Sequence, residues 1–130
     1  MLFNTIVSEL KGAYERDEVN NLPLEDFLNK IREASTKNIL YTIHALDEMN
    51  AEDELISNGE VREVIFNGEI VEDYPEDKRG HSCLMMSYTQ NGRPVHVVCA
   101  PKEEYLAVVT AYVPSQDKWE DDFKVRRKRS

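Results

Sequence analysis

The sequence predicts an α+β domain in which N-terminal helices pack on a largely antiparallel sheet of about four strands. Three observations carry this prediction: apolar residues recur at helical spacing in residues 1–36, strand-like runs fill residues 69–112, and Asn91-Gly92 separates two of these runs. Asn-Gly between two strand-like runs is the strongest short-range signal for a β-hairpin. With 130 residues, the chain has the length of one domain.

Residues 1–36 are predicted to form a helical extension ahead of the main domain at 37–130. The two apolar stripes at helical spacing are Leu2, Phe3, Ile6, Val7 and Leu10, and then Leu24, Phe27, Leu28 and Ile31. Pro23 suits the first position of the second helix, and the acidic residues that follow it favour a helix start. These stripes predict packing against the core, and the alternative is a face that binds a partner.

The middle of the chain is predicted to hold two further helices. A short apolar run at 39–42 leads into a helix at about 43–49, and a second helix is predicted at 59–66. Ser57 or Asn58 can cap this second helix, and Asn67-Gly68 gives a stop signal before the first strand.

Strands are predicted at 70–74, 83–89, 94–100 and 105–112, and Trp119 and Phe123 are expected to hold a C-terminal segment against the body. With Asn91 and Gly92 as a two-residue turn, Gln90 faces Arg93. Cys83 then lies opposite Ala100 and Cys99 opposite Leu84, so the two cysteines point to opposite faces of the sheet and no disulfide is expected.

The register of the last two strands stays open at this stage. If Ala100 pairs with Tyr105, Arg93 lies opposite Tyr112 and His96 points to the other face of the sheet. A slip of one residue instead brings His96 to the face of Thr110 and Tyr112.

Charge is unevenly distributed along the chain. The net charge is −9, and five of the sixteen basic residues lie in the tail at 124–129, which leaves 11 basic against 25 acidic residues in 1–123. Such a body repels a polyanion unless its few cations are focused in one place. The N-terminus lacks the basic start and apolar stretch of a signal peptide, and no apolar run is long enough to cross a membrane, so we expect a cytoplasmic protein with reduced cysteines.

Residues 39–128 resemble the bacterial family named domain of unknown function 4258. The segments that carry the resemblance are Thr42-Ile43-His44-Ala45-Leu46, the residues 67–77, Ser82-Cys83-Leu84, the residues 92–98, Thr110-Ala111-Tyr112-Val113-Pro114, Trp119, and Phe123 to Arg127. The resemblance implies a RelE/ParE-like toxin fold and a small, zinc-finger-type antitoxin partner. Many members carry a basic residue near Asp47 and Glu48, and the acidic residues here weaken an expectation of RNA binding.

Read as a toxin-like domain, the chain is expected to cleave RNA without a metal or another cofactor. Such cleavage needs an acid, a base and cations at the phosphate. The residues that offer these groups are His44 and His96 as acid and base, Arg93 as a cation, and Tyr112 and Thr110 as hydrogen-bond donors. Arg126, Arg127 and Lys128 in the tail are candidates for contacts to phosphate.

Each candidate also has a structural interpretation. His96 among valines is also typical of a hydrogen-bonded sheet histidine, His44 of a helix start, and the basic tail of a solvated end. His81 lies in a polar loop and is expected to be exposed. Metal binding is not expected, because no close pair of ligands such as C-x-x-C or H-x-x-x-H occurs. The alternative function is therefore a non-enzymatic protein-binding module on the same fold.

Overall fold

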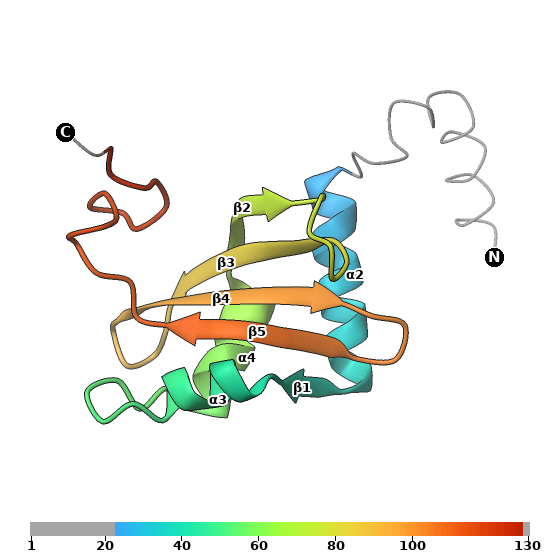
Figure 1. Ribbon diagram of the computed structural model, residues 1–130, viewed down its shortest axis with the longest axis horizontal. Coiled ribbons are helices and arrows are strands. Elements are labelled where there is room, and N and C mark those ends of the chain that lie inside the picture. The colour runs from blue at the N-terminus through green and yellow to red at the C-terminus, as the bar shows by residue number, and fades with distance from the viewer. Residues whose placement is uncertain (1–22, 129–130) are drawn as a thin grey trace.

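A single mixed sheet of five strands organises the part of the chain that the computed structural model describes, residues 23–128. The strand order is β1-β5-β4-β3-β2, as Figure 1 shows. The strands are β1 (Ile39–Tyr41), β2 (Glu69–Tyr74), β3 (Ser82–Tyr88), β4 (Pro94–Pro101) and β5 (Leu106–Tyr112). The helices are α2 (Leu24–Lys37), α3 (Ile43–Met49) and α4 (Asn58–Asn67). The apolar stripe predicted at Leu2 to Leu10 lies outside the described residues.

The prediction of an α+β fold is confirmed, and the strand count is corrected from about four to five. The pairs β2–β3, β3–β4 and β4–β5 are antiparallel, as expected. The additional strand is β1, which pairs parallel to β5, with Ile39 opposite Leu106. Because β1 has only three residues, it is too short to show an alternating pattern in the sequence.

Two of the helices begin at side-chain caps that satisfy their free backbone donors. Thr42 caps α3 by accepting a hydrogen bond from the backbone N of Ala45. Ser57 caps α4, and Glu60 completes a reciprocal capping box with it. In α2, Pro23 lies one residue before its predicted first helical position, at the capping position, and forms no side-chain bond there. Glu25 and Asp26 lie in the first turn, as the sequence predicts.

The sheet has an inner face and an outer face, and each carries its own cluster. The inner face packs against α2 and α4, which lie together on this side of the sheet in Figure 1, and its fully buried strand residues are Cys83, Met85, Val95, Val97, Cys99, Leu106, Val108 and Ala111. The outer face carries a smaller cluster of buried residues, which comprises Leu84, Met86, Trp119 and Phe123. The C-terminal segment, residues 114–128, therefore supplies the cover of the outer face, as predicted for Trp119 and Phe123.

The hairpin predicted at Asn91-Gly92 is present, but its turn is longer than two residues. Thr89 N donates to Arg93 O at 3.0 Å and Gly92 N donates to Thr89 O at 2.8 Å, so three residues, 90–92, form the loop. Gly92 adopts φ +80°, the left-handed conformation typical of a three-residue loop. The register is shifted by one residue from the predicted one, and Cys83 lies directly opposite Cys99. The prediction that the cysteines face opposite sides is wrong; both are buried and free.

The β4–β5 ladder decides the register that the sequence left open. His96 pairs with Tyr112 and Val98 with Thr110, and a bulge at Val109 shifts the rest of the ladder by one residue. The alternative with Ala100 opposite Tyr105 is wrong, since Ala100 pairs with Ala107. His96, Thr110 and Tyr112 therefore share the outer face of the sheet. Among the described residues, no helix has the length and apolar character needed to cross a membrane.

Candidate functional site

His96 lies at the centre of the outer face, under the C-terminal segment. Its side chain is fully buried. Its Nδ1 lies 3.2 Å from the hydroxyl of Tyr112, and its Nε2 lies 2.8 Å from the carbonyl oxygen of Phe123. The indole of Trp119 packs edge-on against the imidazole, with ring centroids 4.5 Å apart. Both ring nitrogens thus have partners, and burial lowers the pKa of His96 below its ordinary value.

Arg126 fastens the C-terminal segment to the β2 edge of this face. Its guanidinium donates two hydrogen bonds to the Glu72 carboxylate, at 2.7 and 3.1 Å, and lies 4.7 Å from the centre of the Trp119 ring. The hydroxyl of Tyr74 also donates to Glu72. Although burial favours the protonated acid, these bonds lower the pKa of Glu72, and burial together with the bond to Glu72 raises the pKa of Tyr74 to about 12. Lys124 adds an ion pair to Glu69 on the same strand, at 2.8 Å.

The uncovered part of the outer face forms a groove of about 460 Å³, here called the His44 groove. Its walls come from the start of α3, the bulge of β5 and the turn between β2 and β3, and its lining residues are Thr42, His44, Tyr74, Asp77, Arg79, Ser82, Val98, Val109 and Thr110. The bulge in β5 turns both Val109 and Thr110 toward this groove. The fold thus brings two of the predicted residues, His44 and Thr110, to one site.

The charged groups of the His44 groove are paired with one another. Arg79 binds Asp77 through two side-chain hydrogen bonds, at 3.1 and 3.2 Å, and Asp77 also accepts from Ser82 at 2.7 Å. These bonds, the one from the Arg79 side chain first, lower the pKa of Asp77 well below its usual range. His44 Nε2 lies 3.4 Å from the carboxylate of Glu48, one helical turn further along α3. Since 67% of the His44 side chain is exposed, its imidazole is accessible from solvent.

A second, smaller hollow lies where the C-terminal segment leaves β5. We call it the Trp119 hollow; it measures about 390 Å³ and is lined by Glu48, Tyr112, Val113, Ser115, Lys118, Trp119 and Arg126. Burial raises the pKa of Tyr112 to about 12, so its hydroxyl is protonated at neutral pH and can donate a hydrogen bond.

The remaining predicted site residues lie elsewhere. Arg93 lines neither the groove nor the hollow, because its guanidinium binds Glu60 at the start of α4, at 2.7 and 3.0 Å, and the carbonyl oxygens of Glu54 and Leu55. Arg127 pairs with Glu120 and Asp121 within the C-terminal segment. Lys128 is exposed.

His81, expected to be exposed, is partly buried instead. Its Nε2 lies 2.6 Å from Asp73, and its ring stacks on Phe27 with centroids 3.6 Å apart. The expectation failed because Phe27 approaches this loop from α2, 54 residues away in the chain, and the local sequence carries no sign of that contact.

From the sequence, four residues of this region are not predicted as site residues: Glu48, which is named only as a departure from the family, and Glu72, Tyr74 and Arg79. Tyr74 and Glu72 lie in a predicted strand, and the alternating pattern of that strand gives no sign that Arg126, more than 50 residues further along the chain, binds Glu72. Arg79 lies in an acidic turn whose distance from His44 depends on the tertiary fold. Among residues 23–128, no three histidine, cysteine or acidic side chains gather in a way that could hold a metal ion.

The fold and the site define a class: an α+β domain with a mixed five-stranded sheet whose outer face is partly covered by its own C-terminal segment. The chain belongs to the family described as domain of unknown function DUF4258, which it matches over residues 41–113, more than half of its length. This match runs from the last residue of β1 through the end of β5 and includes His44, His96, Thr110 and Tyr112. Neither the curated proteins nor the solved structures contain a significant match to the chain.

Proposed function

We propose that this chain is a protein-binding module on a RelE-like fold, and that a partner protein docks beside the His44 groove. The proposal is based on one observation: the basic side chains that line the groove lie against carboxylates of the same chain. Among the described residues that line it, Arg79 is bound to Asp77, and His44 lies against Glu48. A phosphodiester requires cations that are free to bind it. In the groove, the guanidinium of Arg79 is instead already bound by a carboxylate of the same chain.

An exposed apolar row next to the groove supports a protein partner. Leu40 is 47% exposed, Ile43 is 78% exposed and Leu46 is 43% exposed. Ile43 and Leu46 lie three residues apart in α3, so they share one side of that helix. The row follows the short edge strand β1 into α3, and exposed apolar side chains grouped in this way favour association with another protein.

The expected partner carries basic residues around an apolar segment. The chain has a net charge of −9, and Asp47 and Glu48 lie on α3 beside the apolar row. Complementary charge accelerates association and excludes wrong partners. A small antitoxin-like protein of the zinc-finger type, the partner implied by the family resemblance, would be such a protein, and this chain would then be the toxin-like component of the pair.

The test is co-purification with the protein encoded next to this chain, followed by titration calorimetry. Ile43→Asp and Leu46→Asp are expected to weaken the complex at least about tenfold each, since they place a carboxylate in an apolar contact. Leu24→Asp is the matched control, because Leu24 is also 47% exposed and lies at the start of α2, away from the row. Absence of a complex, or equal affinities for all three variants, would contradict the proposal.

RNA cleavage without a metal is the second candidate, and one observation favours it. His44 is exposed in the same groove as the Thr110 hydroxyl, and Glu48 lies close enough to orient its imidazole. A histidine placed in this way can act as a general base. Arg79 would then have to exchange Asp77 for phosphate.

His44→Ala and His96→Ala separate this candidate from a structural role. If the parent cleaves RNA, His44→Ala should lower the rate by about 10²–10⁴ with an unchanged Tm. His96→Ala should lower the Tm, because it removes a fully buried side chain with two partners. A parent that leaves RNA intact, measured by gel electrophoresis over hours, would exclude the enzymatic reading.

A further inference from the structure

The turn that follows α3 presents a leucine to solvent from a strained backbone. Leu55 adopts φ +48°, in the left-handed region where the Cβ of an ordinary residue lies too close to the backbone. The residue is 64% exposed. Within residues 23–128, Phe123 is the only other non-glycine residue with a positive φ, and Phe123 is buried. Leu55 therefore combines backbone strain with an exposed apolar side chain.

The conformation of Leu55 is one that glycine or asparagine ordinarily adopts. Leu55 N donates to the carbonyl oxygen of Ala51 at 2.9 Å, which closes a single helical turn. The left-handed residue that ends such a turn is most often glycine and sometimes asparagine, because these two residues tolerate it best. Since most of Leu55 lies in solvent, packing within the chain does not explain the choice of leucine here.

Hydrogen bonds on both sides of Leu55 fix this conformation. Arg93 donates to the carbonyl oxygen of Glu54 at 2.7 Å and to that of Leu55 at 3.3 Å. The guanidinium of Arg93 is in turn held by the buried carboxylate of Glu60. The backbone N of the residue after Leu55 donates to the carbonyl oxygen of Met49, at the end of α3. A side chain presented from a fixed turn loses less conformational freedom when a partner binds it.

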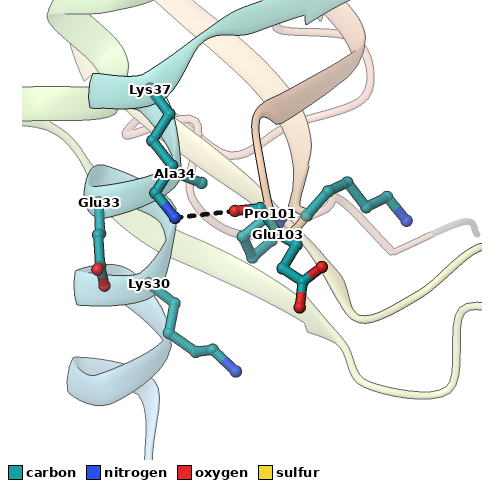
Figure 2. A pocket seen from close by; sticks show the side chains of 7 residues that line it. Lys30, Glu33, Ala34, Lys37, Pro101 and Glu103 are labelled. Atoms are coloured by element: carbon teal, nitrogen blue, oxygen red, sulfur yellow. Dashed lines mark hydrogen bonds between the residues drawn. The ribbon is translucent and has the colours of Figure 1, made fainter.

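A fixed turn does not by itself indicate a binding surface. The turn between β4 and β5 is also held by a cation, because Lys37 Nζ donates to the carbonyl oxygen of Glu103 at 2.9 Å, the dashed line in Figure 2. That turn exposes the charged residues Glu103 and Glu104, and none of residues 102–105 has a positive φ. The turn at Leu55 differs because it exposes an apolar side chain and its backbone is strained at that residue.

We propose that Leu55 is an anchor for the partner protein and enters an apolar pocket on that partner's surface. This inference rests on the proposed function, and it extends the interface from the apolar row to the turn at the end of the same helix. Backbone strain kept at an exposed position indicates a role in binding rather than in folding. Glu52 and Asp53 are exposed in the same turn, so we expect basic side chains at the rim of the partner's pocket.

The test compares Leu55→Asn with Leu55→Met in the full chain, by thermal unfolding and by titration calorimetry with the protein encoded next to this chain. Asparagine tolerates the left-handed conformation but removes the apolar anchor. Leu55→Asn should therefore weaken the complex about tenfold or more, with a Tm equal to or above that of the parent. Methionine keeps a similar apolar volume, so Leu55→Met should bind within about threefold of the parent. Leu24→Asn is the matched control, since Leu24 is an exposed leucine at the start of α2 and its replacement should leave the affinity unchanged.

The results of these titrations separate the inference from the proposed function. If Ile43→Asp weakens the complex and Leu55→Asn does not, the apolar row binds the partner without Leu55, and the inference is wrong. A Tm of Leu55→Asn clearly below that of the parent would show that the leucine stabilises the turn, which would also overturn it. Absence of any complex would overturn the inference together with the proposed function.

Discussion

His96 and Tyr112 face each other across the β4–β5 ladder, with Nδ1 of the imidazole 3.2 Å from the tyrosine hydroxyl. The other ring nitrogen lies 2.8 Å from the Phe123 carbonyl oxygen, which can only accept a hydrogen bond. Nε2 therefore carries the proton, and Nδ1 accepts from Tyr112. This neutral ring joins the sheet to the C-terminal segment, so the state of His96 decides how firmly that segment is held.

The stability of the protein should consequently decrease when the pH falls below about 6.5, the value for an unperturbed histidine. Burial lowers the folded-state pKa of His96, so between that pKa and about 6.5 the unfolded chain binds more protons than the folded one. The contribution is complete above this window and is lost as the pH falls through it. Urea unfolding at pH 5 and pH 7.5 measures the difference, which should be smaller in His96→Gln. An identical difference in both proteins would contradict the assignment.

The Arg93–Glu60 pair should contribute strongly to stability, because Glu60 is almost fully buried at 3% exposure. The bond from Arg93, with others from Thr89 and the Ser57 backbone, lowers the pKa of Glu60 to about 2. Arg93→Ala leaves that charge without its partner and should cost about 3 kcal/mol or more in the free energy of unfolding. Arg79→Ala breaks an exposed pair and should cost less than about 1 kcal/mol. Similar losses in chemical denaturation would argue against this reading.

The same pair predicts a second pH dependence at the acidic end. The folded-state pKa of Glu60 lies below its ordinary value of 4.5, so the stabilisation is complete above about 4.5. It is lost as the pH falls toward 2, where the carboxylate takes up a proton in the folded state. Denaturation between pH 5 and pH 2 should therefore show a steeper loss of stability in the parent than in Glu60→Gln. Parallel curves would show that other carboxylates dominate.

Two glycine substitutions should have opposite effects on stability. Gly92 adopts φ +80° in the hairpin loop, with open space where a Cβ would lie, so Gly92→Ala introduces backbone strain alone, about 1 kcal/mol. Gly59 lies in α4, where a Cβ would make an ordinary 3.6 Å contact with the Ser57 hydroxyl. Gly59→Ala should therefore stabilise by about 0.5–1 kcal/mol. A stabilised Gly92→Ala variant would mean that the loop has a different conformation.

The sequence predicted the elements well where local chemistry determines them. The cap at Ser57 and the hairpin at Asn91-Gly92 are set by residues close in the chain, and both are present. The register was wrong because one additional loop residue changes every pair along β3 and β4, and Asn-Gly is compatible with either loop length. β1 was missed because its pairing with β5 crosses 67 residues. Of the predicted site residues, Arg93 lies outside the groove because its guanidinium is bound to Glu60 at the start of α4.

The corrected register places Cys83 and Cys99 side by side, and yet we expect both thiols to be unreactive. Each is fully buried, and the contact with Cys99 and burial raise the pKa of the Cys83 thiol. Since thiolate is the reactive form, a raised pKa and lack of access both slow modification. Native protein at pH 8 should react with Ellman's reagent only as fast as it unfolds, whereas both thiols should react at once in 6 M guanidinium chloride. Rapid labelling of the native protein would show that the sheet opens locally.

Substitution of Glu48 tests what its acidic side chain contributes at a position near which the family resemblance implies a basic residue. Its carboxylate accepts a hydrogen bond at 3.1 Å from the backbone N of Ala111, a residue of β5 that lies past the stretch paired with β1. The same carboxylate also lies against His44. Glu48→Gln keeps an acceptor and should lose little. Glu48→Arg has no acceptor, so the part-buried Ala111 N–H is left unpaired at a cost of about 1–3 kcal/mol.

Asp47→Arg is the matched control for Glu48→Arg, because it makes the same change of charge on the preceding residue of α3, which is exposed. Thermal unfolding should place Asp47→Arg close to the parent and Glu48→Arg well below it. Fluorescence titration with single-stranded RNA then tests the two functional proposals in the same proteins. Glu48→Arg removes the carboxylate that lies against His44 and adds a cation beside the groove, so only this variant should gain affinity for RNA if the groove can bind a phosphodiester. Equal, purely charge-driven gains in both variants would leave the protein-binding proposal as the better account of this face.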